Sequence, residues 1–287
     1  MTLTEIHIAG DPILDRYIYG TVSKKRFFEE PEKREEYLGG AANVVENVMS
    51  CLSNYGFDKK IKKSFCNYYS EEYPTFTRFI VNNKLYFEHF DRKYKTTQYN
   101  HDFECFWKNG STTTSFPHSF NKYILCVSDY NKGSCGKGFL QNTRFKYEYC
   151  VVDSKYRSCD LDFLKNCKVK IWRCTGKEYD EAWAGNFDYV IHTNAAKPVR
   201  LIDVKTNSVT TIPILNPAEK VVDTVGAGDT FTAAITSCIA YSMRFNKNLT
   251  LKEAIEYANH LCQIVIQEQF TRTADITVED YFVHNKR

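Results

Sequence analysis

The sequence lacks the features that direct a chain to secretion or into a membrane. No basic stretch followed by an apolar segment stands near Met1, so we expect no signal peptide. The apolar run at 231–243 is well short of the ~18–20 residues that span a bilayer. We therefore expect a soluble, cytoplasmic protein without a membrane partner.

Paired cysteines, metal-binding patterns and a strong charge imbalance are also missing. The 11 cysteines lie between Cys51 and Cys262 without any Cys-x-x-Cys pair, so we expect reduced and mostly buried thiols. No His-Glu-x-x-His sequence or Cys/His cluster predicts a zinc site. The formal net charge of +3 is too close to neutral to suggest a nucleic-acid partner.

The N-terminal part of the chain contains a short strand, a helix and a hairpin pattern. Residues 6–9 are apolar and predict a strand. After Gly39-Gly40, apolar residues recur at helical spacing up to Leu52. Two β-rich runs, 76–81 and 85–90, predict a hairpin that turns at Asn82-Asn83, because asparagine tolerates a positive φ.

From residue 121 onward, apolar strand patterns alternate with helical ones. Thr250 and Glu253 have the spacing of a capping box at the start of the last long helix. The alternation predicts an α/β fold with a mostly parallel central sheet flanked by helices, in one domain over 1–287. Strands are expected at 123–127, 149–152, 169–172 and 189–191, and helices at 178–184, 228–243 and 251–267.

The run Asp-Thr-Val-Gly-Ala-Gly-Asp-Thr-Phe at 223–231 is the strongest local signal of chemistry. Glycines before a helix let successive amides face one point, and the helix dipole favours an anion there. We expect Gly226, Ala227 and Gly228 to form such an anion hole. A carboxylate at Asp229 beside a phosphate suits a base that deprotonates an attacking hydroxyl. By itself, however, Gly-x-Gly-Asp is also typical of a helix-capping aspartate.

The whole run resembles the C-terminal signature of the ribokinase-like (pfkB) carbohydrate kinases. The stretches at 10–20 and 39–44 are similar to the N-terminal part of the same family, in the expected order. The segments 128–133 and 152–155 resemble the kinase domain of bacterial enzymes that act on heptose 7-phosphate. The resemblance implies a ribokinase-like fold with a small β lid, with lid segments expected within 16–38 and 74–100.

The resemblance also implies roles for individual residues. A sugar or sugar phosphate would accept the γ-phosphoryl group of ATP, and D-glycero-D-manno-heptose 7-phosphate is the most specific candidate. Mg²⁺ would be the cofactor, and a monovalent cation is a further expectation. Asp229 would be the catalytic base. The substrate-binding residues would be Asp15, Gly39, Gly40, Asn43 and Asp129. On the nucleotide side lie Lys155, Thr193 and Asn259, with Glu178 near Mg²⁺ and Asp223 near the monovalent cation.

Several positions depart from the family pattern. Thr175 replaces the asparagine of an Asn-x-x-Glu element, and the nucleotide loop at 193–198 has no glycine. The segment after Tyr55-Gly56, which usually contains a strand, is shortened, and the lid stretch 23–39 is short and highly charged. These departures leave two alternatives open: a non-catalytic pseudokinase, or a ribokinase, fructokinase or nucleoside kinase. Family members often dimerise through the lid, so a homodimer is a further expectation.

Overall fold

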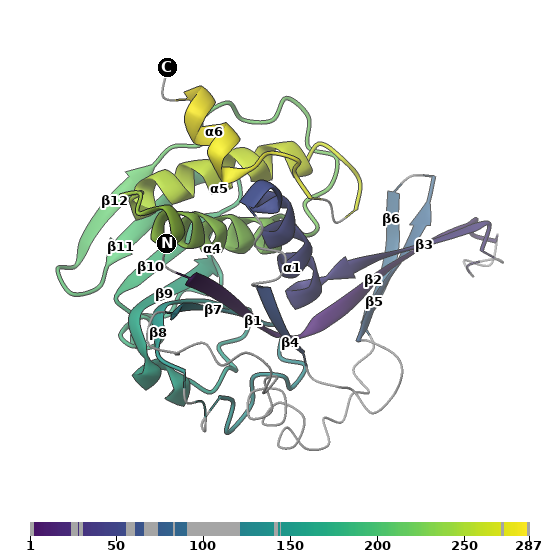
Figure 1. Cartoon of the computed structure of the whole chain (residues 1–287). Helices are drawn as coiled ribbons and strands as arrows, with labels where there is room; N and C mark the ends of the chain where they lie inside the picture. Colours follow the sequence, from purple (N-terminus) through teal and green to yellow (C-terminus); the bar gives the residue numbers. More distant parts are fainter. Residues whose placement is uncertain are drawn as a thin grey trace.

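Two β-sheets and a set of helices make up the described part of the chain (Figure 1). The larger sheet has eight strands and the smaller has four. The computed structural model describes residues 3–23, 28, 31–55, 61–65, 74–82, 84–90, 121–140, 143, 145–270 and 273–285.

The larger sheet is mostly parallel. Its strand order is β12-β11-β10-β9-β8-β7-β1-β4, and every neighbouring pair from β4 to β10 is parallel. Antiparallel pairing adds β11 and β12 at one edge. The strands are β1 (Leu3–Gly10), β4 (Ile61–Phe65), β7 (Asn121–Asp129), β8 (Tyr147–Ser154), β9 (Cys167–Thr175), β10 (Tyr189–Asn194), β11 (Lys197–Asp203) and β12 (Ser208–Ile212).

The central strands are buried on both faces, which explains their continuous apolar sequences. In β7, Ile124 and Cys126 belong to one hydrophobic cluster, whereas Leu125 and Val127 belong to the other. This alternation follows from the pleat, which points successive side chains to opposite faces. The carboxyl ends of the parallel strands therefore meet along one edge, between two packed layers.

Long helices cover one face of the larger sheet, as Figure 1 shows for α1, α4 and α5. The capping box at the start of α5 is formed as expected, with Thr250 accepting from the Glu253 amide. The helices are α1 (Gly40–Cys51), α3 (Glu181–Ala184), α4 (Ala227–Phe245), α5 (Leu251–Val265) and α6 (Val278–Asn285), with short 3-10 turns η1 (Ser53–Tyr55) and η4 (Asp162–Asn166).

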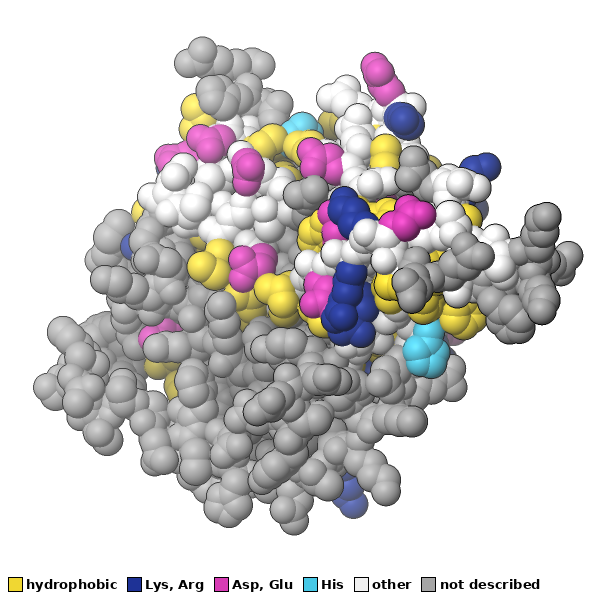
Figure 2. Space-filling model, turned by 90° about the vertical axis from the view of Figure 1, so that its right-hand side faces the viewer, with side chains coloured by type: hydrophobic (Ala, Val, Ile, Leu, Met, Phe, Trp, Pro, Cys, Tyr) yellow, Lys and Arg dark blue, Asp and Glu magenta, His cyan; other side chains and the backbone are white. Residues whose placement is uncertain are grey.

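The smaller sheet projects from the carboxyl end of β1 (Figure 1). Its order is β3-β2-β5-β6, with β2–β5 parallel and the outer pairs antiparallel. We call this sheet the lid. In Figure 2, lysine and arginine side chains lie beside acidic ones on this side of the molecule, and Glu36 contacts Arg16 and Arg34. The lid strands are β2 (Pro12–Tyr19), β3 (Lys33–Gly39), β5 (Thr75–Val81) and β6 (Lys84–Phe90).

A buried aspartate fixes the junction between the larger sheet and the lid. Asp11 lies between β1 and β2 and is fully buried. Gly10 has φ 143°, and a Cβ there would meet the Ser128 carbonyl oxygen at 2.0 Å. The Asp11 carboxylate accepts hydrogen bonds from the backbone amides of Tyr130, Lys132 and Ser134. The loop after β7 is thereby held against the start of the lid.

The predicted fold class is confirmed: a ribokinase-like α/β fold with a mostly parallel sheet and a small lid. The hairpin at 75–90 is present, with Asn82 at φ 51°. The single-domain assignment and the lid ranges 16–38 and 74–100 stay predictions, and 91–100 lies outside the described residues. Within the described chain no helix is long and apolar enough to cross a membrane.

One local expectation was wrong, and two features were not predicted. The helix expected at 178–184 spans only Glu181–Ala184, because Asp180 caps it and a turn precedes it. Strand β4 lies in the shortened segment after Tyr55 and pairs with β1, and it was not specifically predicted. The antiparallel hairpin of β11 and β12 was not anticipated. Its residues are mostly exposed, so the apolar pattern of a buried strand is absent.

Candidate active site

The glycine-rich loop before α4 starts the helix with a left-handed glycine, and the anion hole expected here stays a prediction. Gly226 is the N-cap of α4 and adopts φ 80°, a left-handed conformation that glycine tolerates and branched residues avoid. The Ala227 amide makes a long turn contact of 3.3 Å with the Thr224 carbonyl oxygen. The helix dipole and the first-turn amides favour negative charge at this end of α4.

Asp223 orders this loop through direct hydrogen bonds. Its Oδ1 accepts from the Val225 amide at 3.0 Å, and its Oδ2 accepts from the Phe270 amide at 3.1 Å. The carboxylate therefore ties the loop before α4 to the segment that follows α5. The monovalent cation expected near Asp223 stays a prediction.

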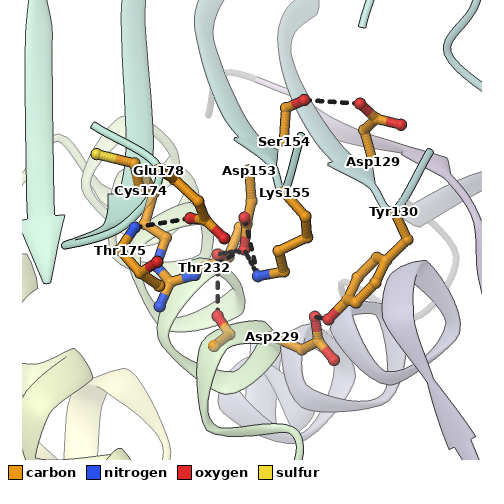
Figure 3. A network of polar contacts seen from close by, with 12 residues as sticks. Asp129, Tyr130, Asp153, Ser154, Lys155, Cys174, Thr175, Glu178, Asp229 and Thr232 are labelled. Carbon is orange, nitrogen blue, oxygen red and sulfur yellow. Dashed lines mark hydrogen bonds and ion pairs between the residues drawn. The ribbon is translucent and has the colours of Figure 1, made fainter. Parts of the chain in front are cut away.

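Asp229 lies in the first turn of α4 and is 2% exposed. Tyr130 Oη donates to its Oδ1 at 2.8 Å (Figure 3), and Asn43 Nδ2 donates to its Oδ2 at 3.3 Å. Burial raises the pKa of Asp229 to about 6, with Asp153 adding to the rise and Lys155 opposing it. The side chain is therefore a base that is ionised at neutral pH and readily accepts a proton.

Asn43 is brought to the base from the opposite side by α1. Its amide is oriented by Asn47, whose Nδ2 donates to Asn43 Oδ1 at 2.9 Å. With that oxygen occupied, Asn43 Nδ2 points toward Asp229. Helix α1 begins at Gly40, where φ is 56° and a Cβ would lie 2.4 Å from the Asp11 carbonyl oxygen. The two-glycine start of α1 is thus required by backbone geometry.

Asp15 and Gly39 are in direct contact across the first two lid strands. A Cβ on Gly39 would lie 2.2 Å from Asp15 Oδ2, so only glycine allows this approach. Asp15 Oδ1 accepts from Arg78 Nη1 at 2.6 Å, and the Arg78 guanidinium lies over the Tyr17 ring. Burial raises the pKa of Asp15, while Arg78 opposes that rise. Arg78 was not anticipated from the sequence.

Asp129 has three hydrogen-bond partners within the protein, and the substrate role expected of it stays a prediction. Its carboxylate accepts from the Asn131 amide and from the hydroxyls of Ser154 and Ser158 at 2.6–2.9 Å. Figure 3 shows Asp129 turned toward Ser154, whereas its neighbour Tyr130 reaches Asp229. Asp129 thus braces the ends of β7 and β8, and the adjacent tyrosine contacts the proposed base.

A buried cluster of charge lies at the carboxyl ends of β8 and β9. Lys155 Nζ is 3.0 Å from both carboxylate oxygens of Asp153, and Arg173 Nη1 is 3.1 Å from Asp153 Oδ2. Thr232 Oγ1, on α4, donates to the same oxygen. Burial alone would raise the pKa of Asp153, but Lys155 and Arg173 hold it below its ordinary value. Lys155 is therefore positioned beside the base and the anion hole.

Of the other two residues expected on the nucleotide side, Thr193 contacts this cluster and Asn259 lies on α5. Thr193 Oγ1 accepts from Arg173 Nη2 at 3.1 Å and donates to the Cys174 carbonyl oxygen at 3.2 Å. It is the second-last residue of β10, and a tight turn after the strand leads into β11 instead of a glycine-rich loop. Asn259 on α5 is 6% exposed, and its Nδ2 has no hydrogen-bond partner within the described residues.

Glu178 closes a turn at the end of β9. Its Oε2 accepts from the Thr175 amide at 2.7 Å, so Thr175 holds the glutamate through its backbone. Among the described residues no group of three or more acidic, histidine or cysteine side chains could hold a metal ion. A single half-buried carboxylate near the phosphate loop fits Mg²⁺, which usually binds through one or two carboxylates and the phosphates of a nucleotide.

Sequence reasoning missed Tyr130, Arg78, Asp153 and Arg173. A signal existed for Arg173, since it is a charged residue within the buried second half of β9, between Trp172 and Cys174. A buried charge requires a partner, and here the partner is Asp153 on the adjacent strand. Arg78 and Tyr130 gave no comparable signal, because arginine and tyrosine are ordinary residues at a strand and at a strand end.

Comparison with known proteins agrees with the architecture and with the motif at 223–231. Residues 177–277 match the sequence profile of the pfkB family carbohydrate kinases. No curated protein sequence matches the chain. The fold is similar to that of ribokinase from Thermotoga maritima, with a TM-score of 0.65, 13% identity and 100% of each chain covered.

Two further solved structures are similar over their whole length. The nucleoside kinase of Methanocaldococcus jannaschii gives a TM-score of 0.63 at 14% identity, covering 100% of this chain and 99% of that one. Phosphofructokinase-2 from Escherichia coli, in complex with potassium, gives 0.62 at 13% identity, with 100% of each chain covered. These identities are low, so the likeness establishes the ribokinase-like fold and leaves the acceptor open.

Proposed function

We propose that the protein is a carbohydrate kinase of the pfkB type, and that it transfers the γ-phosphoryl group of ATP to a hydroxyl of a sugar phosphate; the family match over 177–277 and the ribokinase-like fold support this. The observation that carries this proposal is the setting of Asp229. It is a buried carboxylate with a raised pKa, in the first turn of a helix whose N-terminus suits a phosphate.

The chemistry is a single in-line displacement. The acceptor oxygen forms a bond to the γ-phosphorus, the bond to the bridging oxygen breaks, and ADP leaves with the electron pair. Asp229 takes the proton of the attacking hydroxyl. The amides of Gly226, Ala227 and Gly228 stabilise negative charge on the phosphoryl oxygens. Tyr130 and Asn43 hold the base in place before the acceptor arrives.

The acceptor side consists of Asp15, Gly39, Gly40 and Asn43. A carboxylate and an amide give paired contacts to neighbouring hydroxyls, and the glycines let a sugar approach the backbone. Arg78 adds a largely buried cation next to Asp15. A guanidinium there suits an acceptor that carries a phosphate. This favours a sugar phosphate over a neutral sugar, with D-glycero-D-manno-heptose 7-phosphate as the specific candidate because of the segments at 128–133 and 152–155.

On the donor side, Lys155 is proposed to face the phosphates, and Thr193 and Asn259 the nucleoside. The buried amide of Asn259 supports this, because an unpaired polar group inside a protein is costly unless a ligand completes it. Mg²⁺ near Glu178 would supply charge that neutralises the phosphates. A monovalent cation near Asp223 is proposed by analogy with the potassium-bound phosphofructokinase-2.

A panel assay tests the proposal. The purified protein is incubated with ATP, Mg²⁺ and each of a set of neutral sugars and sugar phosphates, and transfer is followed by ADP release and by phosphorus NMR of the product. We expect transfer to a sugar phosphate, and loss of turnover by roughly 10²–10⁴-fold in Asp229→Asn. Transfer only to neutral sugars would contradict the acceptor class while leaving the kinase activity standing.

A pseudokinase is the alternative, and the altered nucleotide loop favours it. Residues 193–198 form a tight hairpin turn with Ala195 at φ 47°, without the glycines that would let a backbone approach the phosphates. ATP binding without transfer to any acceptor in the panel would support this alternative. The retained Asp229, buried at some cost in stability, argues for a working enzyme.

Exposed apolar side chains on the lid support the proposed homodimer. Leu85, Tyr86 and Phe87 on β6 are 54%, 49% and 54% exposed. Sedimentation velocity tests the idea: Phe87→Ser should shift a dimer toward monomer, and a monomeric wild-type protein would contradict it.

A further inference from the structure

Asp153, Lys155 and Arg173 form a largely buried ionic cluster, and of the three only Lys155 has a role in the proposed reaction. Asp153 is 1% exposed and Arg173 is 5% exposed. All three residues come from the carboxyl ends of β8 and β9, where ligands of open α/β sheets bind. Figure 3 shows Asp153 and Lys155 between Glu178 on one side and Tyr130 with Asp229 on the other.

The cluster contains two cations in direct contact with one carboxylate. Within the described residues, the ion pairs of Lys155 and Arg173 both go to Asp153. Glu178 and Asp229 act on these cations only at longer range, as seen in the pKa values of Arg173 and Asp229. Two buried cations that share one carboxylate leave an uncompensated positive charge, which is unfavourable unless a further anion binds beside them.

The two cations face the anion hole. A Cβ built on Gly228 would lie 3.1 and 3.3 Å from the two terminal nitrogens of Arg173 and 3.4 Å from Lys155 Nζ. The guanidinium and the ammonium therefore lie against the first turn of α4, one residue before Asp229. An anion held by the amides of this turn would be within reach of both side chains.

Arg173 also retains hydrogen-bonding capacity. Its Nη2 donates to Thr193 and its Nη1 to Asp153. Its Nε is buried and has no hydrogen-bond partner within the described residues. A buried guanidinium that is fixed at two points and has an unused donor is prepared for a phosphate, because its planar fork matches two phosphate oxygens.

We propose that Arg173, together with Lys155, contacts the β- and γ-phosphates of the nucleotide at Gly228 and stabilises the phosphoryl group during transfer. The proposal rests on the proposed kinase function and adds to it a phosphate-binding arginine from β9. Asp153 is then a positioning residue, because it fixes both cations without touching the substrate. The cluster supplies fixed positive charge next to the nucleotide loop that lacks glycine.

Nucleotide affinities separate this role from a purely structural one. Dissociation constants for ATP, ADP and AMP are measured by calorimetry in the Asp229→Asn background, which prevents turnover. Arg173→Met and Lys155→Met should each weaken ATP and ADP binding on the order of tenfold to a hundredfold, with AMP binding changed less than about twofold. Arg244→Met, at the far end of α4, is the matched control and should change none of the three.

Steady-state kinetics give a second readout in the presence of Asp229. Arg173→Met should lower kcat by roughly 10²–10³-fold without changing KM for the acceptor. Arg173→Lys keeps the charge but loses the planar fork, so its kcat should lie between those of wild type and Arg173→Met. Circular dichroism and thermal melting establish that each variant is folded.

If Arg173→Met does not fold, the double variant Asp153→Asn/Arg173→Met removes both members of the ion pair and keeps the net charge of the cluster at its wild-type value. An unchanged ratio of ATP to AMP affinity in whichever of these variants folds would overturn the proposal. Failure of the kinase function is distinguishable: a wild type that binds ATP but phosphorylates no acceptor still reports on Arg173 through the affinities. If no nucleotide binds, the readout is the rise in Tm that tripolyphosphate causes. We expect this rise in the wild type and its loss in Arg173→Met. An equal rise in both proteins would overturn the proposal.

Discussion

Asp229 is buried with neutral hydrogen-bond partners, so replacing it by asparagine should stabilise the protein while removing its activity. The carboxylate is 2% exposed, and it contacts Tyr130 and Asn43. A buried charge without a directly paired cation is unfavourable, and here its position is required by the proposed chemistry. Asparagine has nearly the same shape and no charge.

The magnitude follows from the raised pKa. The pKa of Asp229 rises from 3.8 to about 6 on folding, mainly through burial. The folded state therefore binds the proton more tightly than the unfolded state, so stability falls as pH rises from about 4 to about 6. Above pH 6 the full cost of the ionised form is present, about 3 kcal/mol. In Asp229→Asn, a nitrogen takes the place of the oxygen that accepts from Asn43 Nδ2. Two donors then face each other, and the lost hydrogen bond costs about 1 kcal/mol.

The expected net gain at pH 8 is thus about 2 kcal/mol, which corresponds to a rise in Tm of about 4–6 °C. Urea denaturation and thermal melting of wild type and Asp229→Asn at pH 8 and pH 5 measure it. At pH 5 the wild-type carboxyl is mostly protonated, so the difference between the two proteins should shrink by about half or more. The kinase assay on the same samples should show the loss of turnover.

Asp153→Asn is the matched control with the opposite sign. Asp153 is equally buried, but it is paired with Lys155 and Arg173, which hold its pKa below the ordinary value. Its removal leaves two cations uncompensated and should destabilise the protein by roughly 3–5 kcal/mol. If Asp229→Asn were less stable than wild type at pH 8, or if the two variants shifted in the same direction, the account of the charges in this site would be wrong.

Three more results are expected at this site. The pH–rate profile should have an acidic limb near pH 6 from Asp229. Tyr130→Phe should move that limb to higher pH, because it removes a hydrogen bond that lowers the pKa of Asp229. A limb at the same pH in both proteins would contradict the assignment of Asp229 as the base. Gly39→Ala should raise KM for the acceptor about tenfold or more, with the ATP dissociation constant unchanged, because its methyl group would displace the Asp15 carboxylate. Arg78→Gln should raise KM for a sugar phosphate more than for its unphosphorylated sugar, measured side by side, and an equal effect on both would argue against a phosphate contact.

The sequence by itself determined the architecture and the proposed base. Continuous apolar strands alternating with amphipathic helices can bury both faces only in a layered, mostly parallel sheet. The glycines before α4 and the capping box at Thr250 mark the helix starts through local chemistry, and the structure has both. The motif at 223–231 indicated Asp229 as the proposed base, because the motif is defined by residues that are adjacent in the sequence. These features are local, so a sequence pattern can encode them.

The tertiary structure alone decided which side chains meet Asp229. Asn43 is 186 residues away and Tyr130 is 99 residues away, and the parallel sheet brings their elements to one edge. Asp129 and Tyr130 are adjacent at the end of β7, yet the first turns to Ser154 and the second to the base. Local sequence does not encode that choice, because it depends on which partners the neighbouring strand and α4 supply. The same holds for Arg173, whose proposed role rests on its distance to Gly228 on a different element.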